Sequence, residues 1–190
     1  KVELLMQTTP LTEEQAALIE ELSQAGQRMN RLNKTLLLLA KIDNNQFTET
    51  EQVNIDKTIQ KLVEQYKNAL SQKNISLHTK IIADASIEAN QTLMEILIGN
   101  LLSNAIRHNV QGGTINIFID KTRFTISNSG RSISLDTSRL FQRFQKQSAD
   151  SNSLGLGLEM VKRICNLYNA EISYSFAECL HSFSVSFNYY

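Results

Sequence analysis

The fold follows from one stretch of the chain, residues 95–108, which read EILIGNLLSNAIRH. Its apolar residues recur at the three- and four-residue spacing of an α-helix, and Asn100, Asn104, Arg107 and His108 gather on one side. Asparagine is disfavoured inside helices because its amide competes for backbone hydrogen bonds. The polar stripe therefore indicates either a solvated face or the wall of a site, where an amide oxygen can hold Mg²⁺ without neutralising its charge.

Two glycines open a helix that we predict over residues 156–168, in the stretch Ser153-Leu154-Gly155-Leu156-Gly157-Leu158. Such a turn lets backbone N–H groups approach an anion at the amino end of the helix. It is not a Walker loop, because no Gly-Lys-Ser/Thr follows, and no strand leads into it as the dinucleotide fingerprint requires. By itself the stretch is equally typical of an ordinary small-residue turn. Residues 128–130, at the end of a predicted strand, are likewise typical of an ordinary turn.

A long helix is predicted from the capping box of Thr12 and Gln15 to the polar cluster that begins at Asp43. Its apolar positions form a heptad seam of Leu18, Leu22, Ala25, Met29, Leu32, Leu36 and Leu39. We interpret residues 1–7 as the end of a preceding antiparallel helix, which makes residues 1–46 a truncated helical hairpin. Two copies would form a four-helix dimer bundle.

Residues 47–190 predict a separate α/β domain after a polar linker at residues 44–52. Helical patterns begin near Ile55 and at Asn90, and alternating apolar residues indicate strands and hairpins over residues 75–81, 114–119, 124–128, 171–176 and 182–188. Because helices and hairpins alternate, the expected fold class is α+β: the helical hairpin followed by a two-layer sandwich with an antiparallel or mixed sheet.

Composition excludes several classes of function. Lys and Arg together number 19, as do Asp and Glu, so no overall field favours nucleic acid or an anionic membrane. No apolar run approaches the roughly 18–20 residues that cross a bilayer. The two cysteines, Cys165 and Cys179, form neither a disulfide framework nor a zinc site. We expect no nucleic-acid partner, no membrane contact by this chain and a cytoplasmic location.

In this order, the stretches resemble the catalytic domain of sensor histidine kinases, which belongs to an ATPase superfamily that includes gyrase and a heat-shock chaperone. Residues 95–108 are similar to its N box, 124–133 to its G1 box, 140–144 to its F box and 153–158 to its G2 box. The heptad helix is similar to the second helix of the dimerisation and histidine-phosphotransfer domain. The resemblance implies the two-layer sandwich of this superfamily.

The resemblance also implies a site for ATP and Mg²⁺ with three catalytic residues. Asn104 would coordinate the metal, Asn100 would support the phosphate–metal cluster and Arg107 would meet phosphate oxygens. The other implied nucleotide contacts are His108, Asn128, Gly130, Ile133, Arg143, Lys146, Gly155, Leu156, Gly157 and Leu158. Asn128 departs from the aspartate that usually accepts the adenine amino proton, and Ser132 and Ser153 replace glycines. An amide oxygen still accepts that bond but without charge assistance, so weak adenine binding is expected.

Hydrolysing members of the superfamily have a glutamate base where this chain has Asn100. An amide cannot act as a general base, so the resemblance implies a kinase whose γ-phosphoryl group goes to a histidine upstream of Lys1 and then to a response-regulator aspartate. His78 and His181 are expected to be structural. The expected partners are a second copy of the hairpin and a response-regulator receiver domain, in a bacterial sensor with a membrane anchor. The alternatives are a degenerate nucleotide-binding module and a related ATPase or serine kinase.

We predict that Asn104→Ala abolishes Mg·ATP binding while the domain stays folded, because alanine removes the amide oxygen expected to hold the metal. Titration calorimetry measures the affinity and circular dichroism reports the fold. Unchanged affinity in the folded variant would contradict the assignment of Asn104.

Overall fold

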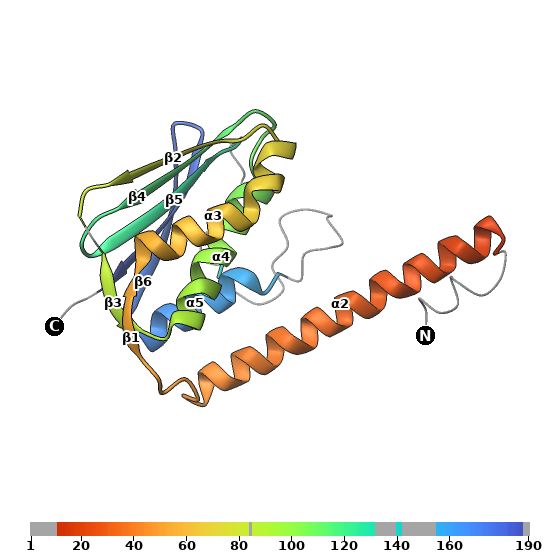
Figure 1. The fold of residues 1–190 in the computed structure, drawn as a ribbon, viewed down its shortest axis with the longest axis horizontal. Coiled ribbons are helices and arrows are strands. Elements are labelled where there is room, and N and C mark those ends of the chain that lie inside the picture. Colours follow the sequence, from red (N-terminus) through yellow and green to blue (C-terminus); the bar gives the residue numbers. More distant parts are fainter. Residues whose placement is uncertain (1–10, 84, 132–139, 142–154, 188–190) are drawn as a thin grey trace.

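The computed structural model describes residues 11–83, 85–131, 140–141 and 155–187. A long helix, α2 (Glu13–Asp43), leads into a two-layer domain in which α3 (Ile55–Gln72), α4 (Gln91–Arg107) and α5 (Gly157–Leu167) cover one face of a five-stranded sheet (Figure 1). Among the described helices, none is both long and apolar enough to span a membrane.

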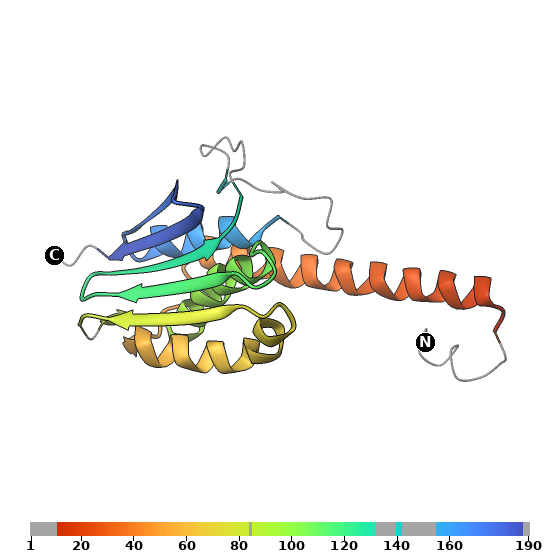
Figure 2. The ribbon, with the colours of Figure 1, turned by 90° about the horizontal axis from the view of Figure 1, so that it is seen from above.

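Helix α2 begins and ends where its sequence predicts. The Gln15 N–H donates to Thr12 Oγ1 at 3.2 Å and the Thr12 N–H donates to Gln15 Oε1 at 3.0 Å, so the predicted capping box is confirmed. Only the last turns of the helix reach the domain core, through the buried Leu39 and Ile42. The rest of α2 extends away from the domain, as Figure 2 shows from above.

The five-stranded sheet has the order β2-β4-β5-β7-β6. Its strands are β2 (Ser76–Ile81), β4 (Thr114–Ile119), β5 (Arg123–Ser129), β6 (Ala170–Ala177) and β7 (Leu180–Phe187). The β2–β4 pair is parallel and the other pairs are antiparallel, so both predicted hairpins and the mixed sheet are confirmed. Alternate residues of β4 and β7 are buried, which places the apolar core between the sheet and the helices.

A second, two-stranded sheet was not predicted. Strand β1 (Glu51–Asn54) pairs antiparallel with β3 (Ser86–Ala89), and Val53 lies opposite Ile87. The assignment of Glu51 and Gln52 to the linker was therefore wrong. Strand β1 has one buried residue, and its partner lies more than thirty residues away along the chain, so no local alternation marks it.

The asparagine caps begin the helices that carry the core. Asn90 Oδ1 accepts from the Leu93 N–H at 3.2 Å, as predicted, and Asn54 Oδ1 accepts from the Lys57 N–H at 2.9 Å. The Asn90 N–H in turn donates to Tyr168 Oη at 2.9 Å, so the start of α4 is attached to the residue that follows α5. The predicted helix before Pro10 lies outside the described residues, and the domain boundary at residue 46 remains a prediction.

Removing the α4 cap is expected to destabilise the domain. Asn90→Ala should lower the free energy of unfolding by about 1 kcal/mol, because the Leu93 N–H loses its acceptor, whereas Asn90→Ser should keep most of it. Urea unfolding followed by circular dichroism measures the difference. Asn68→Ala, on the exposed face of α3, is the control and should be neutral or slightly stabilising. Equal stability of the Asn90→Ala and Asn90→Ser variants would contradict the role of the cap.

Candidate functional site

The polar stripe of α4 lies at the boundary between core and surface. Asn100 and Asn104 are half-buried, while Ile98, Leu101 and Leu102 on the other faces are completely buried. The asparagines therefore belong neither to the core nor to a freely solvated face, which favours the second interpretation of the polar stripe, the wall of a site.

Asn100 contacts the first turn of α5. Its Nδ2 donates to the Ile96 carbonyl at 2.7 Å and lies 3.8 Å from Met160 Sδ, and its Oδ1 lies 2.8 Å from the position that a Cβ at Gly157 would occupy. Only glycine fits at position 157 without displacing the amide. Two predicted site residues that are far apart in sequence, Asn100 and Gly157, are thus brought together.

No described residue caps the amino end of α5 with a side chain, which suits that end to an anion. The first backbone N–H groups of a helix have no partner within the helix, and the N-cap residue Leu156 has no side-chain hydrogen bond to them. Gly155 has φ +67°, a left-handed conformation that turns the chain into the helix at little cost for glycine. Glu159, in the first turn, is 3.6 Å from Arg163, so its charge is partly balanced.

Asn128 lies at the end of β5, almost completely buried at 2% exposure. Its side chain faces the Ser129 carbonyl at 2.9 Å, and because a carbonyl only accepts, the facing atom is the donor Nδ2. The amide oxygen remains the acceptor that the predicted adenine contact requires. The Gly130 N–H donates to the Cys179 carbonyl at 2.9 Å, which ties this turn to the β6–β7 hairpin.

The carboxyl end of α4 is capped by a lysine that the sequence did not reveal. Lys73 Nζ donates to the Ile106 carbonyl at 2.9 Å and to the Arg107 carbonyl at 2.8 Å. A cation at this position satisfies two carbonyls that have no helical partner and stabilises the negative end of the helix dipole. Lys73 thereby holds the backbone of the exposed Arg107 and of His108, which follows the helix.

Several predicted residues lie outside the described part of the chain: Ile133, Arg143 and Lys146, together with the departures Ser132 and Ser153. Of the predicted F box, Leu140 is buried and the Phe141 ring meets Phe183 edge-on with centroids 6.4 Å apart. Leu158, in the first turn of α5, packs partly buried against the core.

The two cysteines are free and lie in different surroundings. Burial raises the pKa of the Cys165 thiol to about 12, so it stays protonated inside α5. The exposed Cys179 is at the tip of the β6–β7 hairpin. Within the described ranges, no group of three His, Cys, Asp or Glu residues could hold a metal ion.

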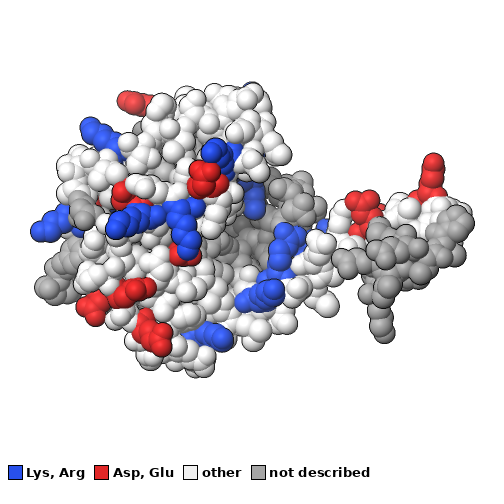
Figure 3. Space-filling view, in the orientation of Figure 1, with Lys and Arg blue, Asp and Glu red and all other residues white. Residues whose placement is uncertain are grey.

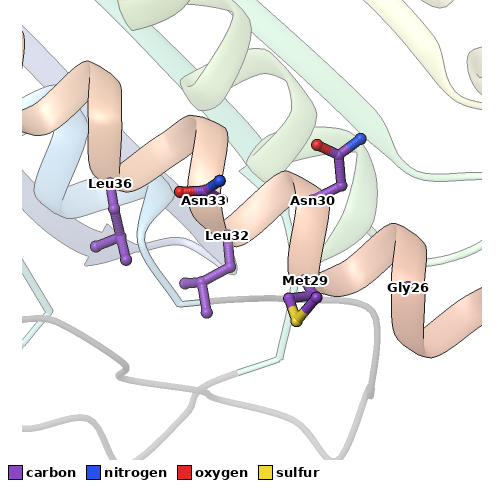
Figure 4. Close-up of a pocket in the computed structure, with 6 residues that line it drawn as sticks. All are labelled: Gly26, Met29, Asn30, Leu32, Asn33 and Leu36. Carbon is purple, nitrogen blue, oxygen red and sulfur yellow. The ribbon is translucent and has the colours of Figure 1, made fainter.

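A groove of about 450 Å³ lies on α2 and not on the helix that carries Asn100 and Asn104. It is lined by Gly26, Met29, Asn30, Leu32, Asn33 and Leu36. Met29, Leu32 and Leu36 point to the same side of the helix (Figure 4). These are heptad positions of the predicted seam, so the groove lies along the apolar face of α2.

Charges on the domain are mixed in sign. Figure 3 shows basic and acidic side chains interspersed over the face that carries α3, with no extended field of one sign there. On α2 the acidic residues Glu13, Glu14, Glu20 and Glu21 lie in the first half, and the basic residues Arg28, Arg31, Lys34 and Lys41 lie in the second half, which ends at Asp43. The face in view is therefore unlike the continuous basic surface of a nucleic-acid-binding domain.

The amino end of α5, the glycine that accommodates an amide and the mixed sheet form a two-layer α/β domain with a candidate anion site. Residues 89–186 match the family described as histidine kinase-, DNA gyrase B-, and HSP90-like ATPase, and the chain belongs to this family. The resemblance to sensor histidine kinases is thereby confirmed at the level of the family, whose domain binds ATP, generally with Mg²⁺.

Curated relatives include heme sensor proteins HssS. That of Staphylococcus aureus strain JH9 is 34% identical over 157 residues, covering 78% of this chain and 34% of that protein. That of Staphylococcus saprophyticus is 29% identical over 161 residues, covering 82% of this chain and 35% of that protein. The chain therefore spans about a third of the length of these relatives.

Solved structures share the fold. Histidine kinase AdeS of Acinetobacter baumannii has a TM-score of 0.71 at 19% identity, covering 98% of this chain and 90% of that chain. The catalytic domain of histidine kinase ThkA has a TM-score of 0.67 at 22% identity, covering 74% of this chain and 95% of that chain. The predicted fold class, a helical element followed by a mixed-sheet sandwich, is confirmed.

The Lys73 cap is expected to stabilise the site measurably. Lys73→Met should lower the free energy of unfolding by about 1–2 kcal/mol, because two helix-end carbonyls lose a charged donor. Lys61→Met is the matched control: Lys61 pairs with Glu95 at 2.6 Å, but its side chain is 55% exposed, so its loss should cost no more than about 0.5 kcal/mol. Chemical unfolding of both variants provides the comparison, and equal losses would contradict the capping role.

Proposed function

We propose that this chain is the kinase core of a two-component sensor histidine kinase, which binds Mg·ATP and passes the γ-phosphoryl group to a histidine and then to a response-regulator aspartate. The observation that carries this proposal is the packing of the Asn100 amide against the first turn of α5. The α4 position that packs on this turn thus holds an amide and not a carboxylate base.

The residues present suit a Mg–phosphate group. Phosphate oxygens are matched by the uncapped N–H groups of α5, and the half-buried Asn104 offers a hard, neutral oxygen on the same helix face as Asn100. When bound, Mg²⁺ supplies positive charge that stabilises the transferring phosphoryl group. Asn104 would hold the metal, and Arg107 would contribute a second positive charge to the phosphates.

Asn100 supports the phosphate–metal cluster without exchanging protons. Its Nδ2 donates to the Ile96 carbonyl and its Oδ1 faces the backbone of Gly157. A carboxamide is not a base near neutral pH, so the side chain cannot remove a proton from water. Hydrolysis is slow for that reason, and the γ-phosphoryl group is retained for an oriented nucleophile. A histidine on the first helix of the dimer bundle is that acceptor.

The remaining proposed nucleotide contacts surround this centre. Asn128 accepts the adenine amino proton, Gly130 lets the base approach the end of β5, and His108 lies against the nucleotide. Gly155, Leu156, Gly157 and Leu158 form the phosphate turn. Ile133, Arg143 and Lys146, outside the described ranges, are proposed to complete the site.

The exposed seam of α2 supports a homodimer. Leu18, Leu22 and Met29 are 54%, 64% and 72% exposed, a pattern that a single helix in water does not favour. We assign residues 1–46 to the dimerisation hairpin and residues 47–190 to the catalytic domain. A receiver domain is the proposed second partner, and the chain is proposed to be the cytoplasmic portion of a bacterial membrane sensor.

The second candidate is a nucleotide-binding module without catalysis, which the amide of Asn128 and the serines at 132 and 153 favour. Both candidates require ATP binding. They differ in whether phosphate reaches a histidine once one is supplied.

We predict that the chain binds Mg·ATP but neither phosphorylates itself nor releases phosphate at an appreciable rate. Fusing the first-helix segment of the bundle ahead of Lys1, or supplying it on a dimer partner, should produce phosphate that is labile in acid and stable in base, as a phosphoramidate is. Radiolabelled γ-phosphate measures the transfer, and the same fusion with Asn104→Ala is the control.

Three results would redirect the assignment. ATP binding without transfer to the added histidine would favour the degenerate module. Rapid phosphate release by the unfused chain would point to an ATPase. Acid-stable phosphate on an added protein substrate would point to a serine or threonine kinase.

A further inference from the structure

A buried histidine on β7 faces the turn that follows β5. His181 is 6% exposed and lies directly opposite Asn128 in the β5–β7 pair. Aromatic rings flank it: the centroid of Phe176 is 4.7 Å from that of His181, and the Tyr174 ring is stacked on it at 6.1 Å. A half-polar ring in this position needs partners for both nitrogens.

Both ring nitrogens have partners, and these determine the tautomer. His181 Nε2 is 3.0 Å from the Arg131 carbonyl and Nδ1 is 2.8 Å from Tyr174 Oη. Because a carbonyl only accepts, Nε2 carries the proton, and Nδ1 of the neutral ring then accepts from the Tyr174 hydroxyl. Burial raises the pKa of Tyr174, so the hydroxyl keeps the proton that it donates.

The same ring also occupies the space beside Gly130. A Cβ at that position would collide with His181 Nε2 and Cδ2, so the glycine is needed for this close approach. The Gly130 N–H is held by the Cys179 carbonyl at 2.9 Å. Residues 128–131 are therefore fixed from β7 by strand pairing, by ring contact and by a directed hydrogen bond.

The contacts that hold His181 extend into a cluster of aromatic rings. Tyr174, the donor to His181, packs against Phe183 with centroids 5.1 Å apart, and Phe183 meets the Phe141 ring edge-on at 6.4 Å. The position of His181 is thus set by a hydrogen-bond partner that is itself packed among aromatic rings.

We propose that His181 is a positioning residue for the adenine subsite, acting through the Asn128–Arg131 turn. The proposal rests on the proposed function, since adenine is the ligand of Asn128 only if the chain binds ATP. His181 itself does not contact the nucleotide in this role. It holds the backbone whose direction aims the Asn128 amide oxygen.

Two substitutions separate positioning from packing. His181→Phe keeps a flat ring but removes the donor to the Arg131 carbonyl, and should weaken ATP binding about tenfold, the effect of one lost hydrogen bond. His181→Gln restores an N–H donor of similar reach and should stay within about threefold of the unmodified chain. Magnesium tripolyphosphate, which lacks adenine, should bind both variants and the unmodified chain equally. Calorimetry measures ATP, and ³¹P NMR follows tripolyphosphate.

A ligand-free measurement tests the geometry directly. ¹⁵N NMR should show the Nε2–H tautomer of His181 and amide shifts of Gly130 and Arg131 that move in His181→Phe and return in His181→Gln. A protonated Nδ1 in the neutral ring would overturn the assignment.

The binding results distinguish the two levels of inference. Equal ATP affinity in His181→Phe and the unmodified chain, or parallel loss of ATP and tripolyphosphate, would overturn the positioning role and leave the proposed function standing. An unmodified chain that binds no ATP would overturn the proposed function and, with it, the role of His181.

Discussion

The Asn100 amide and the first turn of α5 compete for the same space, and the absence of a side chain at Gly157 resolves that competition. Because Gly157 has no side chain, the amino end of α5 approaches the polar face of α4. The first backbone N–H groups of α5 therefore lie beside Asn100. A larger residue at 157 would separate the helices and divide the site. The proposed phosphate site therefore depends on a packing constraint between two helices, since neither helix alone would form it.

The second half of the site depends on the sheet. Strand β5 ends in the Asn128–Arg131 turn, which makes three hydrogen bonds within the protein. The Asn128 amide donates to the Ser129 carbonyl, the Gly130 N–H donates to the Cys179 carbonyl, and the Arg131 carbonyl accepts from His181. A turn whose polar groups already have partners has little conformational freedom to lose on binding, which would favour affinity at the proposed adenine site. Lys73, the residue that follows α3, has the equivalent effect at the end of α4, where it holds the backbone carbonyl of Arg107.

Helix α2 joins the domain through apolar contact more than through charge. Leu39 and Ile42 are 2% and 3% exposed, whereas the ion pair of Arg163 with Asp43, at 3.0 Å, has both side chains 40% exposed and contributes little in water. The burial of two side chains at one end leaves most of the apolar seam of α2 uncovered. Helix α2 therefore has one end that packs on the α/β domain and a longer part whose apolar side chains are exposed.

Local signals in the sequence determined the caps of α2 and α4, the polar face of α4 with Asn100 and Asn104, and both hairpins, because capping, periodicity and turn chemistry act between residues close along the chain. Asn128 became a candidate only through the family resemblance, since the residues around it predict an ordinary turn. The tertiary structure alone decided the rest. The β1–β3 pair, the Lys73 cap and the contact of Asn100 with Gly157 join segments tens of residues apart, and single-sequence periodicity carries no information about such pairs. His181 shows the difference most clearly: the sequence indicated an ordinary structural histidine, and only strand register placed it opposite Asn128 with both nitrogens engaged.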